Sequence, residues 1–527
     1  MTESPIPTID PVDMWQHMLS TWGTLLGPLA AAGADKVDRS DKRFAAPEWD
    51  HPAFDLMRQG YSIMSDYMLG AVEAMPESDP AQKAKMAFAV RTIVEAMSPA
   101  NSPFTNPQAL GRAVETKGQS LIAGMNHLVA DLGRGQLTHT DPDAFEVGRN
   151  IAITPGKVIK ETPLYQLIHY VPTTADVLAV PLVIFPPWIN RYYILDLNPQ
   201  KSFIAWVVAQ GVSVFIVSWK SADASMADVI WDDYILRGQI DAIDSVRALL
   251  GVPAVHAIGY CVAGTTLAAT LALLEARGEA DKVKSATFFT AQVDFSVAGE
   301  LLTFIDDQQF GMIDSLVTDG YLDGRVMALT FNMLRGRDLI WSYVANNYLL
   351  GHDYPAFDLL HWNGDTTNLP AKWHRSYLED LYRDNRLVQP GSLSVDGVPI
   401  DLRTVKTTSY IQAGREDHIA PADSVWKIMD NLSGDMTFVL AGSGHIAGVV
   451  NPPAAGKYQY WLGDNQAASL GDFIAGATET KGSWWPHWIE WLRAHDASTV
   501  TASGARVPGQ GALAVIEDAP GRYATTR

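Results

Sequence analysis

The sequence predicts an α/β fold with a mostly parallel sheet, preceded by a mainly helical N-terminal domain. From about residue 146, short apolar runs alternate with helical patterns, which is typical of βαβ units. Residues 1 to about 145 are expected to be helical instead, with apolar side chains at spacings of three and four from Trp15 to Leu29. The chain has 527 residues, more than one ordinary domain of about 150. We therefore expect two domains, 1–145 and 146–527.

Composition indicates a globular protein that does not bind nucleic acid. Hydrophobic residues make up 47% of the chain and charged residues 19%, far from the composition of disordered proteins. The formal net charge is -20. Phosphate backbones are bound by Lys and Arg, so this charge disfavours DNA or RNA as a partner. An anionic small substrate would need a local basic patch.

The first residues and the single cysteine indicate where the protein is located and which cysteine-based sites are excluded. The start, MTESPIPTID, carries neither the positive nor the apolar region of a secretory signal. We find no apolar run of about 18 residues, so we expect a soluble, cytoplasmic protein with no membrane span. Cys261 is the only cysteine of the chain, which excludes internal disulfides and a zinc site built on several thiolates.

The N-terminal helical region contains an apolar stripe that allows two interpretations. The stripe can pack against neighbouring helices, or it can dock onto a partner or an apolar surface. Its members share one helix face: Trp15, Met18, Trp22, Leu25 and Leu29.

The second domain contains the alternating strands and helices. Six segments are expected as strands: Ala179–Phe185, Val212–Ser218, Ala254–Gly259, Ser285–Thr290, Thr408–Gln412 and Met436–Leu440. Two are expected as helices, Ile235–Leu250 and Thr265–Arg277. Between about 295 and 405 the alternation stops, over a length too great for a simple connection. We expect this insertion to form a cap or lid.

The sharpest motif is Gly259-Tyr260-Cys261-Val262-Ala263-Gly264, between a predicted strand and a predicted helix. A nucleophile elbow of the α/β-hydrolase fold has this pattern, here with Cys in place of Ser. The tight turn needs small neighbours and holds the side chain at a helix N-terminus, where the dipole favours a thiolate. A lone cysteine is usually a small buried apolar residue. The surrounding glycines favour a nucleophile instead.

A base and an orienting acid follow in the order that this fold uses. Asp417 comes after strand Thr408–Gln412, and His445 comes after strand Met436–Leu440. Loops after consecutive strands let the carboxylate hold one imidazole nitrogen while the other faces the thiol. Glu416 and His418 compete for the acid and base roles, but a surface charge and a supporting histidine are the better interpretations for them.

Two other histidines are interpreted as structural. His256 lies within the strand that leads to the elbow and is expected to be packed and hydrogen-bonded. His487 belongs to the aromatic run SWWPHW, which is typical of a core.

An oxyanion formed during acyl transfer needs two backbone N–H donors. Val262, directly after the nucleophile, is one candidate. The second should come from the loop after an early strand, in Pro186-Pro187-Trp188-Ile189-Asn190, where Ile189 is our choice.

At these residues the chain resembles the polyhydroxyalkanoate synthases of the long, single-subunit kind (class I-like). Similar segments run from about residue 145 to 490; before that the resemblance is weaker. One departure is Ala263, where many members have Gly. The matching segments are PPWINRYYILDL, SWKSADASMADVIWDDY, GYCVAGT, FDLLHWNGDTTNLP, GREDHIAP and SGHIAGVVNPP.

The resemblance implies polymerisation of (R)-3-hydroxyacyl-CoA into polyester with release of coenzyme A and no cofactor. By motif it assigns Cys261 as the acyl-accepting nucleophile, His445 as base and Asp417 as acid. It further implies association with the growing polyester chain and its granules, a homodimer, contacts with granule-associated proteins, and a role of residues 1–145 in assembly or granule association. Acyl transfer between two thioesters is nearly thermoneutral, so a cysteine keeps the acyl group activated.

Two alternatives remain open. A cysteine-dependent thioesterase or polyester depolymerase would use the same triad, although serine is the usual nucleophile there. A noncatalytic granule-coating protein would need only the apolar N-terminal stripe. The sequence also leaves open the acyl length, the oligomeric state, the position of the lid, and whether His445 or Asp417 activates the attacking hydroxyl.

Overall fold

The computed structural model of the chain describes residues 41–76 and 80–526. The chain divides into two compact units. The first unit consists of residues 1–139 together with 331–355, and the second of 140–330 together with 356–527. The apolar stripe from Trp15 to Leu29 lies outside the described residues, so the two interpretations of it stay open.

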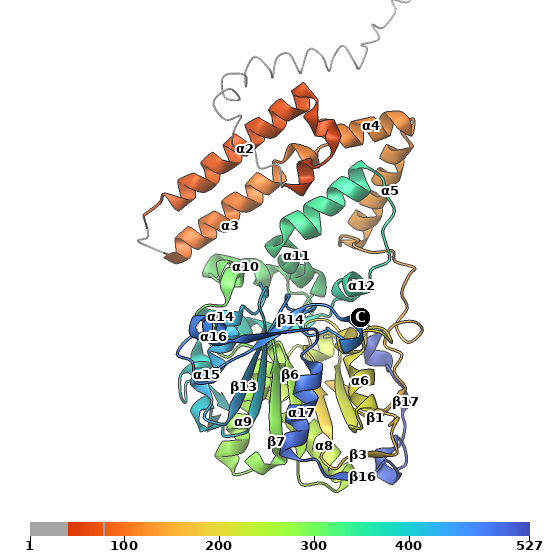
Figure 1. Cartoon of the computed structure of the whole chain (residues 1–527), viewed down its shortest axis with the longest axis vertical. Helices are drawn as coiled ribbons and strands as arrows, with labels where there is room; N and C mark the ends of the chain where they lie inside the picture. The colour runs from red at the N-terminus through yellow and green to blue at the C-terminus, as the bar shows by residue number, and fades with distance from the viewer. Residues whose placement is uncertain (1–40, 77–79, 527) are drawn as a thin grey trace, which may run out of the picture. The chain divides into compact units, whose positions relative to one another are not determined.

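The described part of the first unit is built from helices. The longer ones are α2 (Pro52–Glu73), α3 (Pro80–Ala96), α4 (Pro107–Glu115), α5 (Gln119–Arg134) and the π-helices η9 (Arg337–Trp341) and η10 (Val344–Leu349). Helices α2 and α3 lie side by side (Figure 1). Phe44 and Trp49 pack with Tyr61 of α2 in an aromatic core, in which the Phe44 and Trp49 rings meet edge to face at 4.8 Å.

Residues 331–355 join the first unit because η10 packs closely on α5. A Cβ at Gly124 of α5 would lie 1.8 Å from the Tyr348 carbonyl oxygen, so only glycine allows this approach. The Tyr348 hydroxyl also donates a hydrogen bond of 2.5 Å to Asp131. The insertion expected at 295–405 is therefore not one continuous part of the second unit. Its middle section packs with helices that lie about 200 residues earlier in the sequence.

An 11-stranded mixed sheet forms the second unit, in the order β15-β14-β13-β12-β7-β6-β4-β5-β2-β1-β17. Its six central strands are parallel: β4 (Leu182–Phe185), β5 (Val214–Trp219), β6 (Val255–Tyr260), β7 (Val283–Phe289), β12 (Ser409–Gly414) and β13 (Met436–Ala441). Antiparallel strands extend both edges: β1 (Gly156–Glu161), β2 (Tyr165–Tyr170), β14 (Gln459–Leu462), β15 (Thr478–Lys481) and β17 (Glu517–Asp518).

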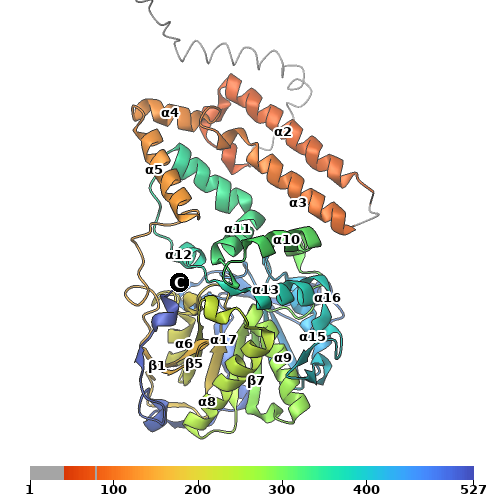
Figure 2. The same ribbon diagram turned by 180° about the vertical axis from the view of Figure 1, so that it is seen from behind.

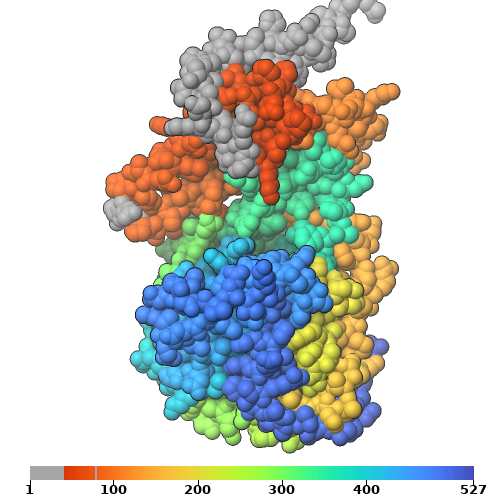
Figure 3. Space-filling model, viewed as in Figure 1, coloured from red at the N-terminus to blue at the C-terminus, as the bar shows by residue number. Residues whose placement is uncertain are grey.

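Helices cover both faces of this sheet. Figure 1 shows α6 (Phe203–Ala209) and α17 (Trp485–His495) in front of the strands, and the space-filling view shows the blue C-terminal part of the chain forming much of this side of the second unit (Figure 3). Seen from behind, α8 (Asp241–Leu250) and α9 (Val262–Arg277) cover the opposite face (Figure 2). Both layers are needed, since the parallel strands are buried on both sides.

The connection from β7 to β12 is mainly helical. Outside residues 331–355 it contains η8 (Gly299–Phe304), α10 (Asp307–Leu316), α12 (Asp358–Gly364), α13 (Ala371–Ser376) and the π-helix η11 (Tyr377–Arg383). The division at residues 330 and 331 falls within α11 (Gly324–Leu334).

The predicted fold class is confirmed. Each of the six expected strands overlaps a strand of the sheet, and both expected helices are present, the first as the π-helix η6 (Tyr234–Ile240) continued by α8. Strand β4 lies between β5 and β6, which is the crossing point of an α/β-hydrolase sheet. Within the described residues, none of the helices is long and apolar enough to cross a membrane.

Candidate functional site

Cys261 is the single residue between strand β6 and helix α9. Its backbone has φ 53° and ψ -128°, a conformation that side-chain-bearing residues rarely adopt. Such strain persists only where the surrounding structure imposes it, and it is concentrated at functional sites. The residue is half-buried, and its thiol is not part of a disulfide. These are the features of the predicted nucleophile elbow.

The elbow depends on two close approaches of the backbone. A Cβ at Gly259 would lie 2.5 Å from the Gly264 Cα, and one at Gly264 would lie 2.4 Å from the Ala291 Cβ. Neither distance is possible for real atoms, so both positions require glycine. The methyl group of Ala263 is accommodated, since this residue is fully buried and its carbonyl accepts a hydrogen bond of 2.8 Å from Gln239.

The loops after β12 and β13 bring the predicted acid and base together. The strands pair in register up to Gly414 and Ala441, so both loops leave the same edge of the sheet. The N–H of Arg415 donates to the Ala441 carbonyl at 2.8 Å, which ties the loops directly. His445 Nδ1 then lies 2.7 Å from Asp417 Oδ2.

Of the two carboxylates in the loop after β12, Asp417 is the one that contacts His445. Its second oxygen accepts hydrogen bonds from the N–H groups of Ile419, at 2.8 Å, and Ala420, at 2.9 Å, so the side chain is locked facing the imidazole. Glu416 is exposed and His418 is half-buried. Asp417 is therefore the carboxylate of this loop that faces His445, while its role as the acid stays a prediction.

The electrostatics of His445 follow from its two partners. Burial by itself lowers the pKa of this ring, but the negative charges of Asp417 and Cys261, and the hydrogen bonds that the ring donates to both side chains, outweigh burial and raise the pKa to about 10. The imidazole is thus held between the carboxylate and the thiol. The structure brings the three predicted residues together, while their catalytic roles stay predictions.

Surrounding groups fix the loop that carries His445. Its carbonyl accepts a hydrogen bond of 3.0 Å from the Tyr260 hydroxyl, directly before the nucleophile. The indoles of Trp484 and Trp485 donate to the carbonyls of Gly448 and Val449. The run SWWPHW is therefore core that supports the site, as interpreted from sequence, with His487 half-buried beside it.

His256 is structural, as expected. It lies in β6 with 1% of its surface exposed, and its Nδ1 lies 2.7 Å from the Ser285 hydroxyl. Burial, followed by the nearby charge of His495, lowers its pKa to about 4.

The loop after β4, which contains the predicted oxyanion donor Ile189, is held by one threonine of the insertion. The Thr367 hydroxyl donates to the Trp188 carbonyl at 2.6 Å and accepts from the Asn190 N–H at 2.9 Å. The two hydrogen bonds thus hold the backbone groups of the residues directly before and after Ile189. Val262, the other predicted donor, is the first residue of α9. Since Phe185 pairs with Gly259, the two loops leave neighbouring strands at one edge. Their role as an oxyanion hole stays a prediction.

Sequence reasoning missed several residues of the insertion and of the loop after β7. Tyr377 and Tyr382 of η11 lie close enough to Cys261 for its charge to act on the pKa of each. The Tyr382 hydroxyl accepts a hydrogen bond of 3.2 Å from Gln292. No spacing in the sequence indicates these contacts, because Tyr382 and Gln292 are 90 residues apart.

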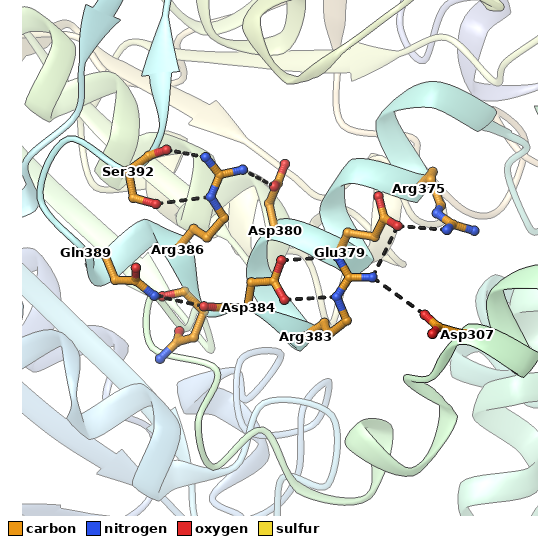
Figure 4. Close-up of polar contacts among 10 residues, drawn as sticks. Asp307, Arg375, Glu379, Asp380, Arg383, Asp384, Arg386, Gln389 and Ser392 are labelled. Atoms are coloured by element: carbon orange, nitrogen blue, oxygen red, sulfur yellow. Dashed lines mark hydrogen bonds and ion pairs between the residues drawn. The ribbon is translucent and has the colours of Figure 1, made fainter.

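The arginines of α13 and its neighbours do not supply the basic patch that an anionic substrate would need. Arg375, Arg383 and Arg386 are each paired with carboxylates, as Figure 4 shows. The carboxylate partners outnumber the guanidinium groups: Asp307, Asp314, Glu379, Asp380 and Asp384. The positive charges of the cluster are therefore neutralised by carboxylates, and the Arg383–Asp307 pair links η11 to α10.

Two family models match the chain. Residues 40–207 match the N-terminus of poly-beta-hydroxybutyrate polymerase (PhaC). Residues 207–452 match the α/β-hydrolase fold, in agreement with the sheet order and the elbow.

Curated relatives match over nearly the whole chain. The poly(3-hydroxyalkanoate) polymerase subunit PhaC of Rhizobium meliloti (strain 1021) is 45% identical over 98% of this chain and 84% of its own length. The poly(3-hydroxyalkanoate) polymerase of Methylorubrum extorquens is 44% identical, over 96% and 85%. The subunit PhaC of Cupriavidus necator is 41% identical, over 97% and 85%.

Proposed function

The chain belongs to the poly(3-hydroxyalkanoate) polymerase family, and from this premise we propose that it polymerises (R)-3-hydroxyacyl groups from coenzyme A thioesters into a polyester. Coenzyme A is the other product, and an acyl group carried on Cys261 is the intermediate. The observation that supports this most directly is the strained Cys261 beside the His445–Asp417 pair.

In the first step the Cys261 thiolate attacks the thioester carbonyl of the substrate. The charge that develops on the carbonyl oxygen is stabilised by the N–H groups of Val262 and Ile189. The carbon–sulfur bond to coenzyme A then breaks, and the leaving thiolate takes a proton from the His445 imidazolium. The acyl group is now a thioester of Cys261, and His445 is neutral.

In the second step the hydroxyl of another hydroxyacyl unit attacks this thioester. Acylation has removed the Cys261 charge, which is one of the causes that raise the pKa of His445. The pKa of the ring therefore falls toward neutral pH, where the imidazole is unprotonated and can act as a general base. His445 accepts the hydroxyl proton and returns it to the cysteine sulfur as the ester forms. Asp417 orients the ring throughout.

Cysteine suits this chemistry better than serine does. Transfer from one thioester to another conserves the activation that ester formation needs, whereas a serine ester would dissipate it. Every step uses side chains, backbone N–H groups and the two acyl units, so we propose that no cofactor or metal takes part.

The test measures the fate of the acyl group. The pure protein is incubated with (R)-3-hydroxybutyryl-CoA while free coenzyme A, free hydroxy acid and insoluble polyester are quantified. We expect coenzyme A to exceed free acid greatly, with the balance recovered as polyester, because a positioned hydroxyl outcompetes water by about 7 to 11 kcal/mol of orientation. Cys261→Ala should abolish turnover and also all thiol labelling, since it removes the only cysteine.

Two outcomes would refute the proposal. Equal amounts of coenzyme A and monomeric acid, with no oligomer, would identify a thioesterase. No coenzyme A release by the parent protein would favour a noncatalytic coating protein.

We also propose, on family membership, that the protein works in the cytoplasm at polyester granules, as a homodimer and with granule-associated proteins. Granule fractionation and light scattering of the pure protein test this. A protein that is monomeric during polymerisation and absent from granules would contradict it.

A further inference from the structure

Tyr382 is a buried phenol of η11 whose position is set from several sides. Its residue is 7% exposed. The Phe295 ring packs against it with centroids 4.7 Å apart, and the Tyr377 ring meets it edge to face at 5.5 Å. Tyr377 is in turn stacked on Trp373 at 5.0 Å. The ring of Tyr382 is therefore held by aromatic packing.

Hydrogen bonds determine which way the Tyr382 hydroxyl points. Its oxygen accepts from Gln292 Nε2 at 3.2 Å, and the Tyr377 hydroxyl is its second hydrogen-bond partner. The Ser424 hydroxyl bonds Gln292 Oε1 at 2.7 Å, which orients the amide with its NH₂ group toward Tyr382. A phenol oxygen that accepts from Gln292 keeps its own hydrogen to donate elsewhere.

The elbow lies next to this network. The Phe289 carbonyl, three residues before Gln292, accepts the Cys261 N–H at 2.9 Å. The Gln292 carbonyl accepts a hydrogen bond of 2.6 Å from Thr265, one turn along α9 from the nucleophile. In agreement, burial raises the pKa of Tyr382 and the charges of Cys261 and Asp417 act in the same direction.

We propose that Tyr382 is a specificity-determining residue that donates a hydrogen bond to the 3-hydroxyl oxygen of the acyl group held at Cys261. This deepens the proposed function and rests on it. The contact has a chemical purpose, because an acyl group without a hydroxyl could otherwise acylate Cys261 and start a chain whose first unit carries no hydroxyl. A site built to hydrogen-bond a substrate hydroxyl rejects analogues that lack it, since its own polar group would be left unpaired.

The experiment compares two acyl donors that differ in this hydroxyl alone. Single-turnover acylation of Cys261 by (R)-3-hydroxybutyryl-CoA and by butyryl-CoA is followed by the mass of the intact protein. We expect the parent to prefer the hydroxyacyl donor, and Tyr382→Phe to reduce the ratio of the two rates by about 10- to 100-fold, mainly by slowing the hydroxyacyl donor.

Two further variants keep the test sharp if Tyr382→Phe folds poorly. Tyr377→Phe removes one partner of the Tyr382 hydroxyl while leaving that hydroxyl in place, so a smaller loss of preference is expected. Tyr410→Phe is the matched control: Tyr410 is buried in β12 and bonds His487 at 2.9 Å in the core, so the preference should be retained.

The outcomes separate this inference from the proposed function. If the parent is acylated by neither donor, the proposed function fails. If the parent is acylated but shows no preference, or if Tyr382→Phe slows both donors equally, the role of Tyr382 is overturned while acyl transfer at Cys261 stands.

Discussion

At the scale of single residues, the site is defined by one strained backbone and one locked carboxylate. Cys261 stays at φ 53° because the register of β6 and the start of α9 leave it no other conformation. Asp417 uses one oxygen for two backbone N–H groups and the other for His445, so its orientation is determined before any substrate binds.

Asp417→Asn should slow acylation of Cys261 by about 10²- to 10⁴-fold at neutral pH. The change removes the carboxylate charge that counts most among the causes raising the pKa of His445, and an amide can present N–H to Nδ1, favouring the wrong tautomer. Single-turnover acylation measures this. Glu416→Gln, on the exposed neighbouring carboxylate, serves as control and should match the parent.

Buried histidines predict sensitivity to acid. The pKa of His256 and that of His374 are each lowered to about 4, in both cases by burial first. A histidine whose folded pKa is depressed contributes stability above its ordinary pKa of 6.5, and this is lost as pH falls toward 4. Urea unfolding across this interval should show a falling free energy of unfolding. His256→Gln should make the fall shallower, and an unchanged slope would contradict the assignment.

At the scale of elements, the elbow is a close backbone contact between β6 and α9. This contact leaves no room for a side chain at Gly259 or Gly264. Gly264→Ala should destabilise the protein by about 1–3 kcal/mol or more, because the new methyl overlaps Ala291. Thermal or urea unfolding measures the loss. Gly311→Ala, inside α10 with open space around it, is the control and should be neutral or stabilising by up to about 1 kcal/mol.

The loop after β4 is held in a similar way by the insertion. Thr367→Val keeps the shape of the side chain but removes its hydrogen bonds to Trp188 and Asn190. We expect acylation to slow by about 10-fold or more as the Ile189 N–H loses its position, with a smaller effect on unfolding. Thr366→Val, on the neighbouring buried threonine, controls for the loss of a hydroxyl. Equal effects of the two variants would argue against a role of this loop in the oxyanion hole.

At the scale of the whole molecule, the chain enters the first unit twice. A truncation that removes only residues 1–139 leaves 331–355 without α5, and thus without the contacts of Tyr348 to Asp131 and Gly124. We expect such a protein to be cleaved within 331–355 in limited proteolysis while the sheet of the second unit stays protected. A chain in which 331–355 is also replaced by a short linker should lose this sensitivity. Protection of 331–355 in the simple truncation would show that the segment is ordered without its helical partners.

The sequence by itself determined the central sheet and pointed to the three residues that the structure brings together, Cys261, Asp417 and His445. Apolar runs marked β4, β5, β6, β7, β12 and β13 because strands buried on both faces read as continuous hydrophobic segments. The glycines around Cys261, and the order of Asp417 and His445 after consecutive strands, identified the elbow and its partners because these features are local. The edge strands lacked such a signal, as in β15, whose residues TETK are all exposed.

Only the tertiary structure decided which distant segments complete the site. Tyr382 meets Gln292 across 90 residues, and Thr367 meets Trp188 across 179. It also decided that residues 331–355 pack with α5 rather than with the sheet. The physical reason is the same in each case: a hydrogen bond or a close contact between remote segments leaves no periodicity in either one, so it becomes visible only when the fold brings the two together.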